Sequence, residues 1–266
     1  MRLRRYSICF LLLTAAVLAT GAGMAQESSM EKVQASFQAE KSSYVLGEPV
    51  WVTYSLMNHG GETLRFAVGN GRKDGFDFSV DSPDGAGFEN VFAHMPPGGL
   101  TVKELLAPGQ TYTRRILLTE YIRFREPGTY TVTCKGNFDI GGEIGSVKGT
   151  QNISTIELVM QKDDEALAAI VEQISACLMD ENPASRSEAA RMLATVRHPC
   201  VLEHLQGALQ DKDDMVVEYA LRGIYNVGNA DAKNILAGFA PEGRDSHLEK
   251  LARNLLEKML RPKAGE

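Results

Sequence analysis

The sequence has few of the residues on which metal sites and disulfide frameworks are built. Only four cysteines occur in 266 residues, and Cys9 lies inside an N-terminal apolar run. The other three, Cys134, Cys177 and Cys200, are too few for a disulfide framework, although one bridge between Cys177 and Cys200 stays open. The five histidines are scattered, and no His-Glu-x-x-His or Cys-x-x-Cys spacing occurs. We therefore expect neither a metal nor a cofactor.

Motifs of nucleophilic and phosphate chemistry are also missing. The chain has no Gly-x-Ser-x-Gly elbow and no Gly-x4-Gly-Lys-Ser/Thr loop. Lys and Arg number 28 against 34 Asp and Glu, which gives a net charge of −6. A chain without a basic surplus is a poor candidate for binding the phosphate backbone, so we expect no nucleic-acid partner.

The N-terminus carries the pattern of a secretory signal peptide at residues 1–25. Arg2, Arg4 and Arg5 precede the apolar run Ile8–Ala19, and small residues lead to a cleavage position after Ala25. The run is shorter than a typical membrane span. We expect cleavage and a secreted or periplasmic protein without stable membrane insertion, with an uncleaved anchor as the alternative. Removal of three of the 28 basic residues leaves 25 against 34 acidic ones, a net charge of −9.

Residues 26–162 show the alternation typical of β-strands. Val50–Met57, Phe76–Val80 and Thr129–Lys135 alternate apolar with polar or β-branched residues, and Gly- and Pro-rich turns separate such segments. Eight or nine short strands without a helix among them predict an antiparallel β-sandwich.

Two motifs in this region resemble immunoglobulin-like domains. The run Gly128-x-Tyr130-x-Val132 resembles the strand that carries the tyrosine corner, with Val132 where the usual motif has its second cysteine. The run from Tyr44 to Val50 (Tyr-Val-Leu-Gly-Glu-Pro-Val) is similar to immunoglobulin-like modules of bacterial secreted proteins, including the proteinase-inhibitor type. The resemblance implies an Ig-like sandwich and says little about function, because such domains host unrelated activities.

Near residue 162 the hydrophobic period changes from two to about 3.6, and a 31-residue repeat begins. Leu193 and Ile224 share one register position, and Leu205 and Leu236 share another. The pattern predicts helices at 165–179, 184–196, 200–210, 215–227, 230–239 and 246–260. Paired helices with an alanine pair in the first resemble HEAT repeats. Residues 163–262 are therefore expected to form about three units of a HEAT-like α-solenoid, with the sandwich docked on the exposed face of 165–179.

Polar side chains recur at the same interval on the second helix of each pair. Glu172, Glu203 and Asn234 form a ladder off the apolar stripe. We expect this ladder to form a partner-binding ridge together with its neighbours Gln206, Gln210 and Lys233, with a plain solvated face as the alternative.

Two further charged sets have structural interpretations. Arg191, Arg222 and Arg253 also recur every 31 residues, and we expect them to pair with acids between adjacent repeats. The acidic run at 211–214 lacks the spacing of a calcium loop and is expected to be a solvated turn between repeats.

The leading functional prediction is an exported, non-enzymatic interaction or scaffold protein of the cell envelope, which binds a protein partner through the helical repeats. The first alternative is a proteinase inhibitor that acts through the Pro-rich loop Ala86–Gly99 of the sandwich. The second alternative is an enzyme whose site assembles from distant residues such as His94, Glu89 and Asp77.

Overall fold

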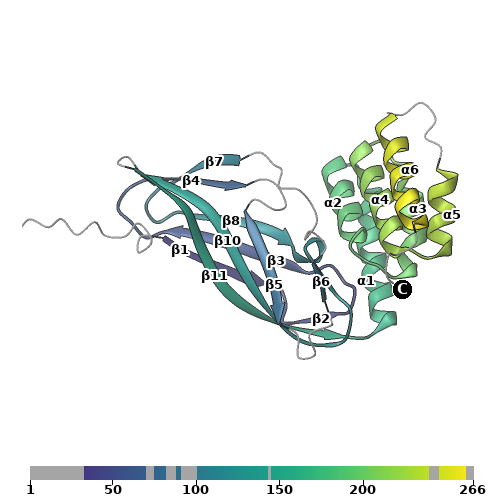
Figure 1. The fold of residues 1–266 in the computed structure, drawn as a ribbon, viewed down its shortest axis with the longest axis horizontal. Coiled ribbons are helices and arrows are strands. Elements are labelled where there is room, and N and C mark those ends of the chain that lie inside the picture. The colour runs from purple at the N-terminus through teal and green to yellow at the C-terminus, as the bar shows by residue number, and fades with distance from the viewer. Residues whose placement is uncertain are drawn as a thin grey trace, which may run out of the picture.

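A computed structural model of the chain consists of a strand-rich region followed by a helical region (Figure 1). The structure describes residues 33–69, 75–81, 88–90, 101–142, 145–239 and 246–261. The last strand ends at Gln161 and the first helix begins at Asp164, where the hydrophobic period changes. The predicted order, β-structure before α-structure, is therefore confirmed.

Eleven strands lie in the described part of the chain: β1 (Val33–Ala39), β2 (Ser43–Val45), β3 (Trp51–Asn58), β4 (Leu64–Gly69), β5 (Phe76–Asp81), β6 (Phe88–Asn90), β7 (Thr101–Leu106), β8 (Thr111–Leu117), β9 (Ile122–Phe124), β10 (Gly128–Gly142) and β11 (Gly145–Gln161). Strict alternation of buried and exposed residues is clearest in β5, as its sequence predicts. One 3-10 turn, η1 (Leu118–Glu120), interrupts a region that was expected to lack helix.

The strands form three sheets, and one of them is mixed rather than antiparallel. The first sheet has the order β1-β3-β8. The second has the order β2-β11-β10-β4-β7, with β5 also paired to β10, and a small third sheet joins β6 to β9. The parallel pair is β2 with β11, which corrects the expectation of a purely antiparallel fold. The three-residue β2 lies beside the last residues of β11, next to the helical region (Figure 1).

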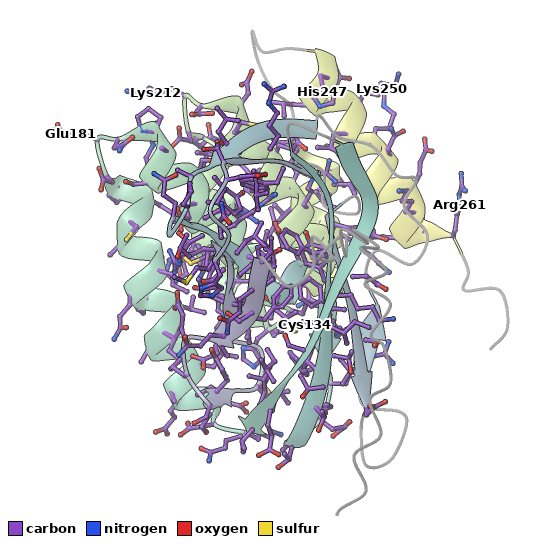
Figure 2. The ribbon with its side chains drawn as sticks, turned by 90° about the vertical axis from the view of Figure 1, so that its left-hand side faces the viewer. Cys134, Glu181, Lys212, His247, Lys250 and Arg261 are labelled. Atoms are coloured by element: carbon purple, nitrogen blue, oxygen red, sulfur yellow. The ribbon has the colours of Figure 1, made fainter. Side chains whose placement is uncertain are left out.

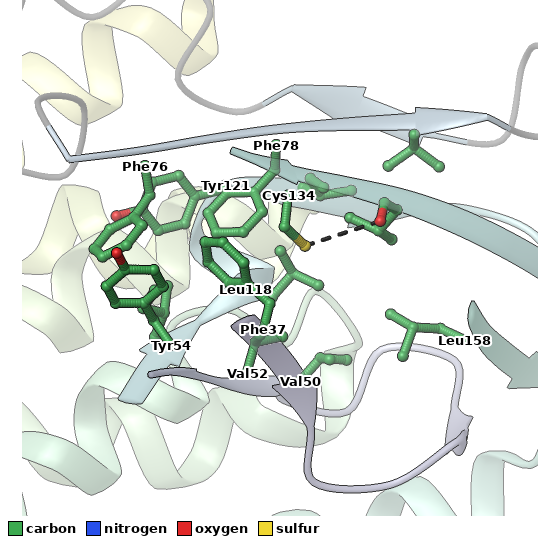
Figure 3. Close-up of a cluster of buried hydrophobic side chains, with 14 of the residues drawn as sticks. Phe37, Val50, Val52, Tyr54, Phe76, Phe78, Leu118, Tyr121, Cys134 and Leu158 are labelled. Carbon is green, nitrogen blue, oxygen red and sulfur yellow. Dashed lines mark hydrogen bonds between the residues drawn. The ribbon is translucent and has the colours of Figure 1, made fainter. Parts of the chain in front are cut away.

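Aromatic side chains from the first two sheets meet in one hydrophobic core (Figure 3). The ring of Phe37 on β1 lies 5.9 Å from that of Phe76 and 6.0 Å from that of Phe78, both on β5. Tyr54 on β3 contacts Phe76 at 5.0 Å between ring centroids. Edge-to-face contacts of this kind stabilise a core beyond the area they bury. The finer assignment as an Ig-like sandwich stays a prediction.

Tyr130 at the start of β10 forms the bond expected of a tyrosine corner. Its Oη donates a hydrogen bond to the carbonyl oxygen of Glu126 at 2.7 Å. Two residues beyond Val132, Cys134 is fully buried, and its Sγ donates to the Val132 carbonyl (Figure 3). Burial raises the pKa of the Cys134 thiol to about 12, so this cysteine is an unreactive part of the core.

The helical region contains six α-helices among the described residues: α1 (Asp164–Ala176), α2 (Pro183–Leu193), α3 (Leu202–Ala208), α4 (Asp214–Val227), α5 (Ala230–Gly238) and α6 (Ser246–Leu260). Short 3-10 turns extend two of them, η2 (Cys177–Met179) after α1 and η3 (Pro199–Val201) before α3. These helices lie where the sequence predicts them, within a few residues at each end. No described helix combines the length and hydrophobicity needed to cross a membrane.

The caps of these helices repeat at the interval found in the sequence. Asn182 and Asp213, 31 positions apart, cap the N-termini of α2 and α4 through their side-chain oxygens. His198 and Asn229, at the same spacing, cap η3 and α5. Each cap satisfies an otherwise unpaired backbone N–H and sets the point where a helix begins. The repeat is therefore carried by helix boundaries as well as by the apolar stripe.

The helical core brings α2, α3 and α4 into close contact. Leu193, Leu205 and Ile224 are fully buried in it. At Gly223 of α4, an added Cβ would lie 2.8 Å from Cδ1 of Leu205 and 2.9 Å from the Cα of Ala194. The second of these atoms is backbone, so the helices can pack this closely only because Gly223 has no side chain.

The described cysteines are all free. Cys177 is exposed and Cys200 is half-buried, so the bridge that the sequence left open between them is not formed. Cys134, in contrast, is buried.

The close approach at Gly223 predicts a difference between two glycines on neighbouring helices. Gly223→Ala should lower the free energy of unfolding by about 1–3 kcal/mol, because the methyl group overpacks the contact with α2. Gly207→Ala on α3, where nothing lies within 4 Å of the added Cβ, should raise it by about 0.5–1 kcal/mol. Urea unfolding followed by circular dichroism at 222 nm measures both. Equal effects would contradict the packing argument.

Candidate functional site

Five of the six residues of the predicted ridge lie on the second helices of the repeats, and Gln210 follows one of them. Glu172 is on α1, Glu203 on α3 and Asn234 on α5, and all three are exposed. Of their neighbours, Gln206 and Gln210 are exposed on or just after α3, and Lys233 is half-buried on α5. The ladder thus follows three successive helices, while its role in binding stays a prediction.

A groove of about 890 Å³ is lined in part by residues of this ridge. Glu172, Glu203 and Gln210 line it, whereas Gln206, Lys233 and Asn234 do not. The remaining walls come from the end of α1, η2, the start of α2 and the polar turns that follow η2 and α3. Glu181 and Lys212, from these two turns, lie near each other at one end of the helical region (Figure 2).

The groove is acidic, with an exposed apolar side chain at its edge. Its lining holds five acidic residues against Arg186 and Lys212. Met179 is 86% exposed, although it is a large apolar residue. Sequence reasoning missed Met179, which occupies the register position of Gln210 in the next repeat. The sequence signal that could have found it is an apolar residue at a position where the neighbouring repeat has a polar one.

His204 on α3 contacts α1, the other helix that contributes a ridge glutamate to the groove. Its Nε2 lies 3.1 Å from Oε1 of Glu172 on α1. The Glu172 carboxylate is largely exposed whereas His204 is mostly buried. The contact holds the carboxylate over the groove and is stronger when the imidazole is protonated.

Beneath the groove, Arg186 of α2 forms a bidentate ion pair with Asp211. Its Nε and Nη2 donate to the two carboxylate oxygens at 2.7 and 3.0 Å, and its Nη1 donates to the carbonyls of Asp180 and Glu181. Partial burial acts to raise the pKa of Asp211, but the hydrogen bonds from Arg186 and from the Asp213 amide outweigh it and lower the pKa. The acidic turn is thus engaged in holding adjacent repeats together, which explains it without a calcium ion.

The recurring arginines pair with acids, but not between adjacent repeats as expected. Arg222 and Arg253 form ion pairs four residues back within their own helices, with Glu218 and Glu249. Arg191, on the first helix pair, instead reaches the strand-rich region. The prediction of bridges between adjacent repeats was wrong, because the same position meets a different neighbour at the end of the array.

Arg191 forms the principal polar contact between the two regions. Its Nε and Nη2 donate to the two carboxylate oxygens of Glu120 on η1, at 2.8 and 2.6 Å. Glu120 is only 7% exposed. Trp51, the only tryptophan, lies beside this pair, with the guanidinium carbons of Arg115 and Arg191 at 4.3 and 5.7 Å from its ring centroid.

Further contacts place the strand-rich region against both α1 and α2. Thr119 Oγ1 donates to Thr195 Oγ1 just beyond the end of α2. An added Cβ at Gly47, after β2, would lie 3.3 Å from Cδ2 of Leu167 on α1. The docking on the first helix that the sequence suggested is therefore present, and α2 contributes the charged part of it.

Much of the sequence on which the inhibitor and enzyme alternatives depend lies outside the described residues. Most of the loop Ala86–Gly99, including His94, lies outside the described residues. Asp77 lies on β5, opposite Lys135, and Glu89 lies on β6, opposite Arg123. These two acids belong to different sheets.

The fold and the groove define a two-part protein in which a β-rich module precedes a helical-repeat array. Family models agree with this division. Residues 37–157 match the N-terminal domain of flagellar collar protein C, and residues 158–257 match HEAT repeats. These two matches agree with the predicted division into a β-rich N-terminal part and a C-terminal HEAT-repeat region. No curated protein matches the chain.

Solved structures resemble the chain only weakly. An engineered protein is 25% identical with a TM-score of 0.28, over 37% of this chain and 50% of its own length. Spo0M, a sporulation control protein from Bacillus subtilis, is 12% identical with a TM-score of 0.27, over 55% of this chain and 56% of that one. The PapD-like domain of human CEP192 is 13% identical with a TM-score of 0.26, over 58% and 98%. Scores of this size establish no shared fold.

The ion pair of Arg191 with Glu120 joins the two regions, so Arg191 should contribute more to the free energy of unfolding than Arg222, its counterpart in the next repeat. Arg191→Met should lower the free energy of unfolding by about 3 kcal/mol, because Glu120 stays buried without its bidentate partner. Arg222→Met removes an ion pair within one helix and should cost about 0.5 kcal/mol. Urea unfolding of both variants measures the difference. Equal costs would show that the contact between the regions adds no stability.

The lowered pKa of Asp211 predicts a dependence on pH. A carboxyl whose pKa is lower in the folded state stabilises the fold above its unfolded pKa of about 3.9, and this contribution is lost as the pH falls through the folded value. The stability difference between wild type and Asp211→Asn should therefore be constant from pH 7 to 5 and shrink below about pH 4. Glu257→Gln, an exposed change on α6, serves as the control. A difference that does not change with pH would contradict the assignment.

Proposed function

We propose that the protein is an exported, non-enzymatic scaffold component of a flagellum-associated structure in the bacterial cell envelope. The predicted signal peptide supports export, and the match of residues 37–157 to a flagellar collar domain supports the location. HEAT repeats are used widely as extended binding surfaces for other proteins. In this view the β-rich module and the repeats act together as one rigid body.

The observation that carries this proposal is the acidic groove between α1, η2 and α3. Its surplus of carboxylates attracts a basic segment, and the exposed side chain of Met179 offers that segment an apolar contact. Methionine adapts to irregular partners because its unbranched chain has several rotatable bonds. The proposed ligand is therefore a protein segment in which apolar residues are flanked by Lys or Arg.

Charge reversal within the groove tests this surface. Tagged full-length chain would be produced in its own bacterium, cross-linked and captured from the envelope fraction. Glu172→Lys combined with Glu203→Lys should reduce recovery of the partner at least about tenfold, because like charges across an interface are strongly unfavourable. Met179→Ser, which removes the apolar contact without changing the charge, should also weaken capture.

A matched control changes the same charge elsewhere. Glu157 on β11 and Glu257 on α6 are exposed and lie outside the groove. Glu157→Lys combined with Glu257→Lys should leave recovery of the partner unchanged. If the groove variant and the control retained the same partners in equal amounts, the groove would not be the binding surface. A third variant, Asn234→Lys, tests whether the surface extends to α5.

A further inference from the structure

The last turn of α6 combines exposed cations with an exposed apolar side chain. Lys258 and Arg261 are exposed and flank Leu260, which is 64% exposed. Neither cation forms an ion pair within the described part of the chain. Residues 258–261, which we call the basic end of α6, therefore have the composition proposed for the ligand of the acidic groove, in which apolar residues are flanked by Lys or Arg.

Leu260 interrupts the polar pattern of the repeat, as Met179 does in the groove. Leu260 stands 31 positions after Asn229, and His198 precedes Asn229 by the same interval. The side chains of His198 and Asn229 cap η3 and α5. Met179 likewise stands 31 positions before Gln210. Both exposed apolar side chains thus replace polar residues of neighbouring repeats, and their burial against each other would remove apolar surface of both from water.

Charge distinguishes Leu260 from Met215, which is also a large apolar side chain exposed on a described helix. Met215 is 49% exposed and directly follows Asp213 and Asp214. Because like charges across an interface are unfavourable, the acidic groove repels that segment. The basic end of α6 instead brings two cations toward the groove together with its apolar side chain.

The groove has carboxylates left to receive these cations. Arg186 engages Asp211 beneath the groove. The four other acids of the lining face one further lysine, Lys212. Among the described residues, no cation pairs with the exposed carboxylates of Glu181 and Glu203. A lysine and an arginine that enter the groove therefore find acids whose charge is not yet compensated.

The basic end of α6 and the groove lie on opposite sides of the helical region. Figure 2 shows Arg261 on one side, and Glu181 and Lys212, which line the groove, on the other. Leu248 and Leu255 of α6 are buried in the helical core and hold the helix in place. The chain therefore does not fill its own groove with this segment, whereas a second copy can present it.

We propose that the acidic groove binds the basic end of α6 from a second copy of this chain. Lys258 and Arg261 of one copy pair with groove acids of the other, and Leu260 packs on Met179. The inference rests on the proposed function of the groove and names its partner. Because two different surfaces meet, each contact leaves one groove and one basic end open, so further copies add head to tail into a ring or a filament.

Analytical ultracentrifugation tests the proposal on the chain produced in its own bacterium and purified in the form that it has there. The wild type should self-associate with a Kd of about 100 μM or tighter, and more weakly as the salt concentration rises. Glu172→Lys combined with Glu203→Lys reverses charge in the groove, and Lys258→Glu combined with Arg261→Glu reverses charge at the basic end. Each pair should weaken association at least about tenfold.

A mixture of the two variants separates a head-to-tail contact from other forms of association. The variant with the altered basic end keeps its groove, and the variant with the altered groove keeps its basic end. The mixture should therefore associate at concentrations at which each variant alone is monomeric. If the mixture stays monomeric although both variants are folded by circular dichroism, the proposed contact is wrong.

Two control variants make the same charge changes without removing a groove acid or a cation of the basic end. Glu157→Lys combined with Glu257→Lys matches the groove variant, and Arg65→Glu combined with Lys162→Glu, at exposed positions, matches the other. Neither control should weaken association.

A wild type that stays monomeric up to about 100 μM, or a folded groove variant that associates fully, would overturn the second copy as partner. The proposed function is decided separately, by whether the groove variant loses a different protein in the capture experiment. The two proposals therefore fail by different results.

Discussion

The ion pair between Arg191 and Glu120 fixes how the two regions of this protein sit against each other. A carboxylate as buried as Glu120 is costly unless a partner compensates its charge and satisfies its oxygens. Arg191 does both through two parallel hydrogen bonds. Glu120 lies on a single turn of 3-10 helix and Arg191 lies within α2. The pair therefore sets where the η1 turn lies along α2.

A cavity of about 580 Å³ lies at this junction. Thr119, next to Glu120, and Thr195, four residues beyond Arg191, both line it, and their hydroxyls are hydrogen-bonded at 3.2 Å. Thr195 Oγ1 in turn donates to the carbonyl of Met192 at the end of α2. A chain of hydrogen bonds therefore runs from the strand-rich region into the helix end, beside the ion pair. The cavity is lined by residues of both regions, so its shape depends on their docking.

The helices were largely predictable from the sequence because each feature of the repeat is local. Apolar spacing of 3.6 and the caps at Asn182 and Asp213 act within one or two helical turns, and the 31-residue interval repeats these local signals along the chain. The strands were predicted less completely. β7 carries weak alternation, and the parallel pairing of β2 with β11 depends on residues more than a hundred positions apart.

The candidate sites were harder to predict, because they form where the periodic pattern ends. Arg191 shares its register with Arg222 and Arg253, yet it alone of these three faces the strand-rich region. Met179 stands in the register of Gln210, and only the structure shows it exposed beside four carboxylates and the Arg186–Asp211 pair. The cavity at the junction draws on separate segments, among them 123–125, 162 and 197, whose proximity follows from the docking of the two regions.

Helix α1 connects the two cavities and so relates their geometry. Asp164 and Leu167, in its first turn, line the cavity at the junction, and Glu172 and Ser175, further along, line the acidic groove. The helix has 13 residues, is capped by Asp163 and buries Leu167 and Val171 in the helical core. The packing of this one helix therefore contributes to the position of residues in both cavities.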